Sequence, residues 1–298
     1  MKLLVLLACL VSVAGAQVFT FSKEQMLKYT AKNPYERFED GRPKVPGELL
    51  QEMKNLTIED VWGVLPRNGF PNQYEGNWQI LHPGRKLVGR AVTAQFMPMR
   101  GDLNDIINAD GKAKGYRGGQ NQWVIDMLQP NDVIVVDLLG QVEGATFVGD
   151  NLAVAIMAAT GAGMVVNGGI RDLEGIAPLD MQAYFRGVHP SAINRNKFML
   201  TGINIPINVG NATVMPGDVV FGDRGGVYFI PPAHVEEILD RAVETHIHDE
   251  WTKNKFIEGK GKYKSTDLYG RPHDPALIKE YEEYKAKRLA ERKQRRKE

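Results

Sequence analysis

Short apolar runs rich in Val and Ile alternate with longer, helix-like runs between about residues 85 and 231, and Gly-rich turns separate them. In a sequence, buried strands are short continuous apolar segments. The helices that connect them are longer, and residues such as glycine mark their ends. Regular alternation of the two patterns is typical of α/β proteins. The sequence therefore predicts an α/β fold for this central part of the chain.

One helix–strand unit in this region is especially clear. The run 152–160 is almost wholly apolar, which predicts a helix buried on most of its sides, with Gly161 and Gly163 as its stop. Residues 164–167 then predict a short buried strand. The pair Gly168-Gly169 follows, and we expect it to form a flexible turn after that strand.

Polar residues flank this unit at both ends. Gly149-Asp150-Asn151-Leu152 opens the helix, and Arg171-Asp172 lies just beyond the strand. Asp150 is a favourable N-cap residue, and the N–H groups of Asn151 and Leu152 would be free to bind a carboxylate or phosphate. Ligands of α/β sheets bind preferentially at the carboxyl ends of strands. The two clusters thus predict one pocket for a small anionic substrate and a hard divalent metal.

Each cluster also has a plain structural interpretation. An Arg–Asp pair after a strand is often only a surface salt bridge, and Gly-Asp before a helix is often only a capped turn. Their occurrence at both ends of one buried unit favours the functional interpretation.

The spacing of these residues is specific. Asp150, twenty intervening residues and then Arg171-Asp172 resembles the Asp-x20-Arg-Asp signature of the RraA-like family, and Glu174 matches its acidic position two residues further on. Four more blocks resemble strands of that family in the same order, namely 87–93, 128–137, 214–220 and 222–231. The resemblance covers about residues 50 to 245.

The resemblance implies a fold and a reaction. The family fold is a compact swivelling β/β/α sandwich, and the family includes the class II, metal-dependent 4-hydroxy-4-methyl-2-oxoglutarate (HMG) aldolases. Such an enzyme is a lyase that cleaves a 4-hydroxy-2-oxo acid and releases pyruvate through a metal-stabilised enolate. Decarboxylation of oxaloacetate is expected as a side activity, because it passes through the same enolate.

The resemblance also implies a role for each matching residue. Asp172 would coordinate a divalent cation directly, Mg²⁺ in the first place and Mn²⁺ in the second, while Asp150 and Glu174 would hold its water shell. Arg171 would offset the negative charge that develops on the substrate, and Asp150 joins it as a catalytic residue. The residues Gly149, Asp150, Asn151, Leu152 and Arg171 would bind the small 2-oxo acid.

Relatives of this core suggest two other functions. RraA itself resembles the core and regulates a ribonuclease by protein contact, so a non-enzymatic regulatory binding protein is the alternative. The complete acidic and arginine set favours catalysis over that role. A methyltransferase is disfavoured, because no Gly-rich strand-to-helix turn with a downstream acid is present to hold an adenosyl cofactor.

The resemblance further implies a homotrimer, or a hexamer of two trimers, whose active site lies between subunits. A carboxylate from the neighbouring subunit would reach the waters of the metal. Glu236, Glu237 and Glu244 are candidates for that group, and the sequence does not distinguish between them.

The amino terminus resembles a secretory signal peptide. Residues 1–16 combine Lys2, an apolar stretch and the small-residue site Ala14-Gly15-Ala16, so we expect cleavage near Ala16 and export to the periplasm or medium. The apolar stretch is too short for a transmembrane segment. The single cysteine, Cys9, would leave with it, so a metal would need oxygen or imidazole ligands.

The rest of the chain divides into three parts. Residues 17–47 are polar and contain prolines, which predicts an irregular N-terminal arm, and residues 48–245 form the RraA-like catalytic domain. Residues 246–298 are expected to form a charged, partly helical C-terminal extension. The net charge of +1 gives no reason to expect nucleic-acid binding.

Details within these parts carry further expectations. Residues 101–122 should form an elaborated loop or short helices near the substrate pocket, and Thr57 with Asp60 predicts a capping box. His246 and His248 are a weak candidate metal pair, because residues two apart on a helix do not share a face. The tail from Trp251 onward is rich in aromatic residues, which favours packing against a neighbouring subunit.

Overall fold

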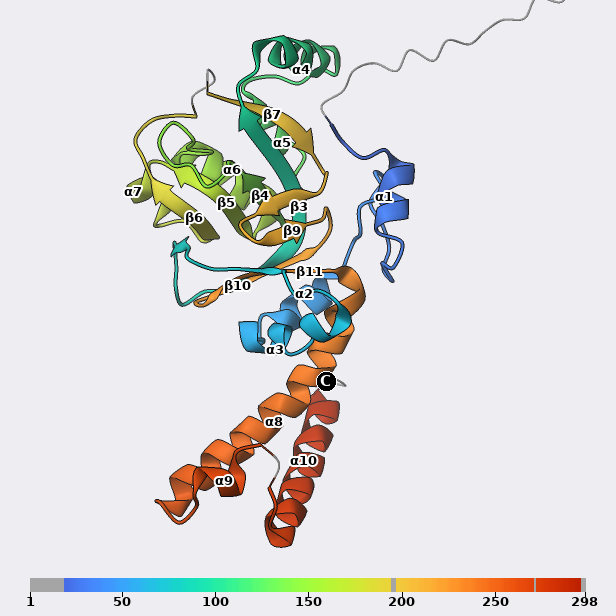
Figure 1. Cartoon of the computed structure of the whole chain (residues 1–298), viewed down its shortest axis with the longest axis vertical. Coiled ribbons are helices and arrows are strands. Elements are labelled where there is room, and N and C mark those ends of the chain that lie inside the picture. The colour runs from blue at the N-terminus through green and yellow to red at the C-terminus, as the bar shows by residue number, and fades with distance from the viewer. Residues whose placement is uncertain (1–18, 194–196, 271, 296–298) are drawn as a thin grey trace, which may run out of the picture.

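The computed structural model describes residues 19–193, 197–270 and 272–295. A mixed sheet forms its centre, with strand order β1-β11-β10-β3-β4-β5-β6-β2 and with β7 paired to β3 (Figure 1). A two-stranded hairpin, β8–β9, packs beside it. The strands are β1 Tyr74–Glu75, β2 Gln79–Ile80, β3 Leu87–Pro98, β4 Asp132–Asp137, β5 Gly163–Ile170, β6 Gln182–Val188, β7 Phe198–Ile203, β8 Ile207–Val209, β9 Ala212–Val214, β10 Val219–Asp223 and β11 Gly226–Ile230.

Helices cover the sheet and extend from it. They are α1 Lys23–Tyr29, α2 Gly47–Met53, α3 Ile58–Trp62, α4 Gly101–Ala113, α5 Gln120–Ile125, α6 Asp150–Thr160, α7 Leu173–Ile176, α8 Val235–Gly259, α9 Ser265–Leu268 and α10 Pro275–Arg295, with short 3₁₀ turns at Pro66–Asn68 and Pro232–His234. The predicted α/β class is confirmed. Strands β3, β4, β5 and β6 run parallel, so their carboxyl ends lie along one edge of the sheet.

Two hydrophobic cores lie on the two faces of this parallel region. Side chains from α4, α5 and α6 bury one face, with Trp123 and Ile156 among them. The β8–β9 hairpin and the β10–β11 hairpin bury the other face, which contains Val133, Val165 and Phe229. The parallel region therefore has helices on one face, and on the other face it has the β8–β9 hairpin and the β10–β11 part of the same sheet.

Helix α6 is less buried than its composition predicted. Only Ala153, Ile156 and Thr160 are buried, while Val154 remains 43% exposed. A helix that lies on one face of a sheet buries the positions spaced three and four apart and leaves its outer face free. The expectation that α6 is buried on most sides was thus wrong within a single chain. The helix instead presents an apolar outer face to the solvent.

Strand β5 is longer than predicted, because it includes Gly168 and Gly169. These glycines allow close packing of backbone segments. A Cβ atom on Gly168 would lie 2.7 Å from Cβ of Leu138, and one on Gly169 would lie 2.9 Å from the carbonyl oxygen of Val142. The expectation of a flexible turn was wrong, since the segment after β4 crosses directly over this pair.

The N-terminal arm is more regular than predicted and is firmly attached. It contains α1, which begins with a capping box between Ser22 and Gln25 that we did not predict. Further along, Arg42 donates two hydrogen bonds of 2.9 Å to the carboxylate of Asp132, which is fully buried at the start of β4. Arg90 approaches the same carboxylate at 3.5 Å. This buried ion cluster joins the arm to the central sheet.

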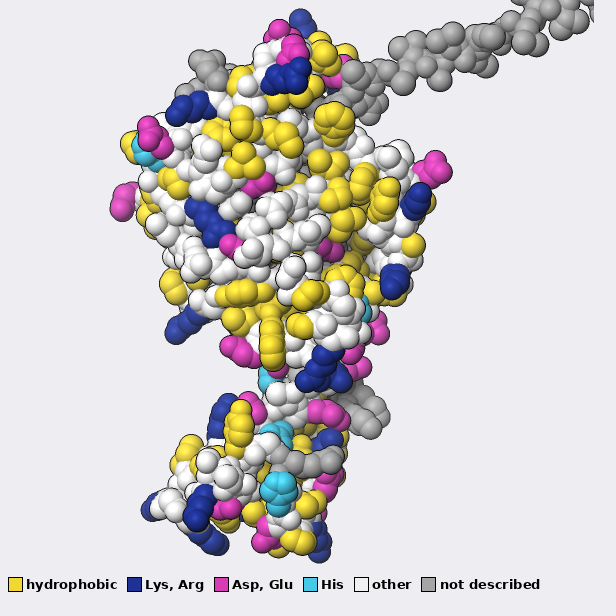
Figure 2. Space-filling model, in the orientation of Figure 1, with side chains coloured by type: hydrophobic (Ala, Val, Ile, Leu, Met, Phe, Trp, Pro, Cys, Tyr) yellow, Lys and Arg dark blue, Asp and Glu magenta, His cyan; other side chains and the backbone are white. Residues whose placement is uncertain are grey.

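The C-terminal extension is a helical hairpin that projects away from the sheet (Figure 1). Helix α8 begins in the body, and α10 packs back along its outer half, where Trp251 and Tyr281 lie with ring centroids 5.3 Å apart. Acidic and basic side chains intermingle over this hairpin (Figure 2). The helical character predicted for the extension is confirmed. Tyr269, one of the aromatic residues of this tail, is 83% exposed within the single chain.

The candidate histidine pair does not form a metal site. His246 approaches Asp60 of the α3 capping box at 2.9 Å, whereas His248 packs its ring against Tyr281. No cluster of three or more His, Cys, Asp or Glu side chains suited to a metal ion occurs in residues 19–193, 197–270 and 272–295. Within those same ranges, no helix is both long and apolar enough to span a membrane. The proposed signal peptide, residues 1–16, lies outside the described residues.

Asp218 gives the fold an expected pH dependence. Burial raises the pKa of its carboxyl to about 7, although Oδ2 accepts a 2.8 Å hydrogen bond from the N–H of Met215. A carboxyl with a raised pKa in the folded state stabilises the fold below its unfolded pKa and loses that contribution as pH rises through 7. We expect about 4 kcal/mol of stability from this group to be lost between pH 4 and pH 8.

Urea unfolding at several pH values should therefore show a weaker dependence of the free energy of unfolding on pH for Asp218→Asn than for the wild type. The amide of this variant does not ionise, and its oxygen still accepts from the N–H of Met215. Asp180→Asn, at a carboxylate that is 92% exposed, is the matched control. Parallel pH curves for wild type and Asp218→Asn would contradict the assignment.

Candidate functional site

The amino terminus of α6 supplies free backbone donors. Gly149 is the N-cap and Asp150 the first helical residue, so the expectation that Asp150 caps the helix was wrong by one position. Asp150 instead accepts from the N–H of Asn151 at 2.8 Å. In the described part of the chain, the N–H groups of Asp150 and Leu152 have no acceptor, whereas that of Ala153 bonds Gly149 at 3.0 Å. Donors for an anion are therefore present, but the Asn151 group is already engaged.

Arg171 and Asp172 follow β5 directly. The N–H of Arg171 bonds the carbonyl oxygen of Val148 at 3.0 Å, which fixes it beside the entry to α6. Asp172 adopts the left-handed conformation, with φ 57° and ψ 42°, and its carboxylate does not cap α7. Nε of Arg171 lies 3.6 Å from Oδ2 of Asp172, and the two side chains are 40% and 37% exposed. A non-glycine residue in this conformation is uncommon, and such residues are frequent at functional sites.

Two glycines show how closely the two clusters approach. A Cβ atom on Gly149 would lie 2.2 Å from Oδ2 of Asp172 and 3.1 Å from Nε of Arg171. A Cβ atom on Gly175, in α7, would lie 2.7 Å from Oδ2 of Asp150. The structure thus brings Gly149, Asp150, Arg171 and Asp172 into one cluster at the carboxyl edge of the sheet.

The acidic residues of this cluster suit a hydrated cation. Among the described residues, the carboxylate of Asp172 has a single ion-pair partner, Arg171 at 3.6 Å, so it can accept further ligands. The carboxylate of Asp150 lies against Gly175 of α7, three residues beyond Asp172, and Glu174 is exposed on the same helix. Magnesium keeps several waters and needs only one or two carboxylates. The set fits a cation held by Asp172 and waters, and it does not form a closed cage.

Sequence reasoning missed two residues just beyond the neighbouring strand β6, His189 and Ser191. Ile170 of β5 pairs with Val188 of β6, and the N–H of His189 bonds the carbonyl oxygen of Ile170 at 3.0 Å, which places His189 beside Arg171. Nδ1 of His189 accepts from the N–H of Ser191 at 3.2 Å, and the backbone carbonyl oxygen of Ser191 accepts from the hydroxyl of Thr146. The signal that could have found them is positional, since both follow the next parallel strand.

A buried polar network fixes the strand ends below the cluster. Asp137 of β4 accepts from Gln95 of β3 and from Asn167 of β5, each at 2.7 Å. Asn167 in turn accepts from Arg186 of β6 at 2.8 Å, and Arg186 donates to Glu75 at 2.6 Å. Satisfied networks of this kind rigidify their surroundings. The four parallel strands are therefore cross-linked just before the residues of the candidate site.

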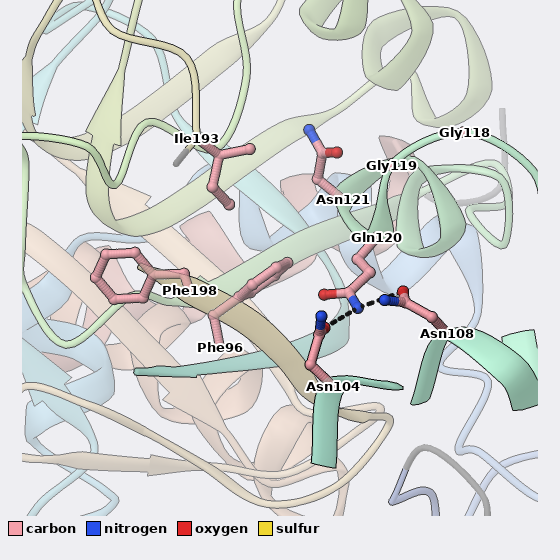
Figure 3. A pocket seen from close by; sticks show the side chains of 9 residues that line it. All are labelled: Phe96, Asn104, Asn108, Gly118, Gly119, Gln120, Asn121, Ile193 and Phe198. Atoms are coloured by element: carbon pink, nitrogen blue, oxygen red, sulfur yellow. Dashed lines mark hydrogen bonds between the residues drawn. The ribbon is translucent and has the colours of Figure 1, made fainter. Parts of the chain in front are cut away.

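A hollow of about 150 Å³ lies along the same edge, between α4, α5 and β7 (Figure 3). The segment 101–122 was expected to be a loop or short helices near the substrate pocket. It instead contains the thirteen-residue α4, which supplies Asn104 and Asn108 to the hollow. Asn121 connects the hollow to the segment that leads into α6, because it donates to the carbonyl oxygen of Phe147 at 2.9 Å.

The three candidate neighbouring-subunit carboxylates all lie on α8. Within one chain this helix begins at the end of the body beside α2 and α3, away from α7 (Figure 1). Each has a partner in its own chain. Glu236 accepts a hydrogen bond from Tyr35, Glu237 accepts one from Asn68, and Glu244 forms an ion pair with Lys285. None of them therefore completes the cluster of its own chain.

These features define a mixed α/β protein with a polar cluster at the carboxyl edge of a parallel sheet, in the place where such folds bind ligands. The sequence model of the RraA-like family, described as Aldolase/RraA, matches residues 58–229, which is more than half of the chain. The chain belongs to this family.

Individual relatives agree with that assignment. A protein of Halalkalibacterium halodurans named "Putative 4-hydroxy-4-methyl-2-oxoglutarate aldolase" is 31% identical over 162 residues, covering 53% of this chain and 75% of the relative. Protein DlpA of Legionella pneumophila is 26% identical over 214 residues, covering 71% of this chain. The match spans only 32% of DlpA, so this chain corresponds to about a third of that protein.

The fold has a solved counterpart. The crystal structure of Streptomyces coelicolor RraAS2, described as an unusual member of the RNase ES inhibitor RraA protein family, superposes with a TM-score of 0.59 at 25% identity. The alignment covers 74% of this chain and 99% of the other. The resemblance seen in the sequence motifs is thus confirmed at the level of family and fold.

Proposed function

We propose that this protein is a divalent-metal-dependent lyase that cleaves a 4-hydroxy-2-oxo acid of the HMG type and releases pyruvate, with oxaloacetate decarboxylation as a side activity. One observation carries the proposal. Arg171 and Asp172 lie over Gly149 at the amino terminus of α6, so a cation, a guanidinium and free N–H groups can act on one small anion. The names of the aldolase relatives support the same reaction class.

The residues of the chain divide the work on the substrate. The N–H groups at the start of α6, Leu152 among them, bind the substrate carboxylate, aided by the helix dipole. The guanidinium of Arg171, whose backbone N–H donates to the carbonyl oxygen of Val148, donates to the keto oxygen as negative charge develops there. Charge-stabilising donors of this kind typically contribute about 10²- to 10³-fold in kcat.

Asp172 would hold the cation, with Asp150 and Glu174 orienting its waters. When bound, a divalent cation supplies Lewis acidity toward the keto oxygen of the substrate. Asp150 also accepts from the N–H of Asn151, which fixes its carboxylate at the mouth of the helix. Gly149 has to remain glycine for this arrangement, because any side chain there would collide with Asp172.

A pyruvate-release assay tests this function directly. Purified protein would be incubated with a panel of 4-hydroxy-2-oxo acids and with oxaloacetate, after EDTA treatment and after addition of Mg²⁺ or Mn²⁺. We expect EDTA to abolish activity and either cation to restore it. Full activity in a metal-free preparation would exclude the metal role. Inactivity on the whole panel would instead favour the regulatory alternative, in line with the description of the Streptomyces relative.

We further propose a homotrimer, or a hexamer of two trimers, with the site shared between subunits. The apolar outer face of α6 supports this, as do Leu139 and Val188, which are 47% and 40% exposed at the same edge of the sheet. Burial of such a patch stabilises an assembly by roughly 25 cal/mol per Å². A carboxylate from α8 of the neighbour, from Glu236, Glu237 or Glu244, would complete the site.

Light scattering should thus give three or six times the chain mass for the wild type and the monomer mass for Val154→Glu, because the new charge cannot be buried without a partner. Val154→Ala is the matched control and should remain assembled. A fully active wild-type monomer would contradict the shared site. A chain ending at Glu250 tests whether the helical hairpin also holds the subunits together.

Export remains a proposal that rests on residues 1–16. Sequencing the amino terminus of the mature protein tests it, and a mature chain that begins with Met1 would overturn it.

A further inference from the structure

The hollow beside the candidate site has an uncommon lining. Phe96, Phe198 and Ile193 form an apolar wall, and the polar lining consists of amides and backbone, with no charged side chain among the described residues that line it. Figure 3 shows the two rings and Ile193 on one side and Gln120 and Asn121 on the other. Its volume of about 150 Å³ is close to that of a cavity known to accept a benzene ring in another protein.

The direction of every amide in this lining is fixed by the backbone. Oε1 of Gln120 accepts from the N–H of Leu200 at 2.7 Å, so the Nε2 group of Gln120 has to be the donor. That group donates to Oδ1 of Asn104 and to Oδ1 of Asn108, both at 2.9 Å. The NH₂ groups of the two asparagines are therefore the ends left for another partner.

Asn121 presents the opposite polarity. Its Nδ2 donates to the carbonyl oxygen of Phe147 at 2.9 Å, and the side chain is 8% exposed. A carbonyl oxygen cannot donate, so this assignment is also fixed, and Oδ1 of Asn121 is the acceptor that remains. The lining thus includes donors from α4 and an acceptor from α5, across the hollow from the aromatic wall.

We propose that this hollow is a binding site for a small, uncharged, planar molecule that carries a carboxamide or lactam group. The carbonyl oxygen of such a group accepts from Asn104 or Asn108, its N–H donates to Asn121, and its ring packs on Phe96 and Phe198. A charged molecule of the same shape is disfavoured, because a lining of aromatic rings, Ile193 and neutral amides offsets little of its desolvation cost. This site is separate from the lyase function and does not depend on it.

Benzamide and benzoate are suitable probes, because they have nearly the same shape and differ in charge. Calorimetric titration of the full-length protein should show saturable benzamide binding with a dissociation constant of about 1 mM or tighter, as expected for a ligand of this size. Benzoate should bind at least about tenfold more weakly. An intermolecular nuclear Overhauser effect between the benzamide ring and the methyl groups of Ile193 would locate the probe in the hollow.

Three site variants and one control variant sharpen the test. Asn104→Asp and Asn108→Asp each keep an oxygen that accepts from Gln120 but lose the NH₂ donor, and at least one should weaken benzamide about tenfold. Ile193→Trp should block the hollow. Asn55→Asp, an equal charge change at an exposed position away from the lining, should leave binding unchanged. Thermal melting verifies that each variant is folded.

Equal binding of benzoate and benzamide would overturn the proposal. Benzamide binding that survives both Asn→Asp variants and Ile193→Trp would overturn it too, since the probe would then sit elsewhere. The absence of saturable benzamide binding up to about 10 mM would equally refute it. Because the readout is binding, none of these outcomes depends on the lyase activity.

Discussion

Asp172→Ala should abolish both divalent-metal binding and pyruvate release, whereas Arg171→Ala should keep the metal and lose turnover by about 10²- to 10³-fold. The division follows from the site. The carboxylate of Asp172 projects from a left-handed residue, and Arg171 is its only ion-pair partner among the described residues, so it is the group free to hold a cation. Arg171 carries a positive charge and cannot coordinate a metal ion, but it can offset negative charge on the substrate.

Calorimetric titration with Mg²⁺ or Mn²⁺, together with pyruvate assays, measures both parts of this prediction. Asp180→Ala is the matched control, because it removes a 92% exposed carboxylate from an Arg–Asp pair elsewhere on the surface. Undiminished turnover of either site variant would refute its assignment. Loss of metal binding in Arg171→Ala would show that the arginine positions Asp172 instead of acting on the substrate.

Asp132→Ala should destabilise the protein by about 3–5 kcal/mol. Asp132 is fully buried and receives two 2.9 Å hydrogen bonds from Arg42, which is itself only 2% exposed, while Arg90 lies 3.5 Å away. Removal of the carboxylate leaves two guanidinium groups beside each other in a nearly dry site. Repulsion between them should also loosen the N-terminal arm.

Urea unfolding measures the loss, and limited proteolysis of the arm measures the loosening. Asp180→Ala again serves as the control, since an exposed pair contributes no more than about 1 kcal/mol. A loss below about 1 kcal/mol for Asp132→Ala would mean that water enters the site and solvates the arginines.

Local sequence patterns predicted most of the fold. The Val- and Ile-rich blocks became β3, β4, β10 and β11, and the Thr57–Asp60 capping box starts α3 as predicted. The errors arose where tertiary contacts decide. The composition of α6 could not reveal that only one of its faces meets the sheet, and Gly168 could not reveal that Leu138 would pack against it.

The candidate site was predictable to the extent that its residues are close in sequence. Asp150 and Arg171 belong to one helix–strand unit, so their proximity could be derived from the spacing. His189 and the network through Asp137 and Asn167 could not, because they depend on which strands lie side by side. The buried pair of Arg42 with Asp132 spans 90 positions, and no local pattern indicates it.

The projecting hairpin has a consequence for how this molecule moves in solution. Helix α8 has 25 residues and is about 37 Å long, and its first half, from Val235 to His246, contacts the body. A compact chain of 298 residues would have a radius of gyration of about 19 Å. Each subunit should exceed that value in small-angle X-ray scattering and should tumble as an elongated particle. Elution volume from a sizing column will then overstate its mass, so that a monomer can pass for a dimer.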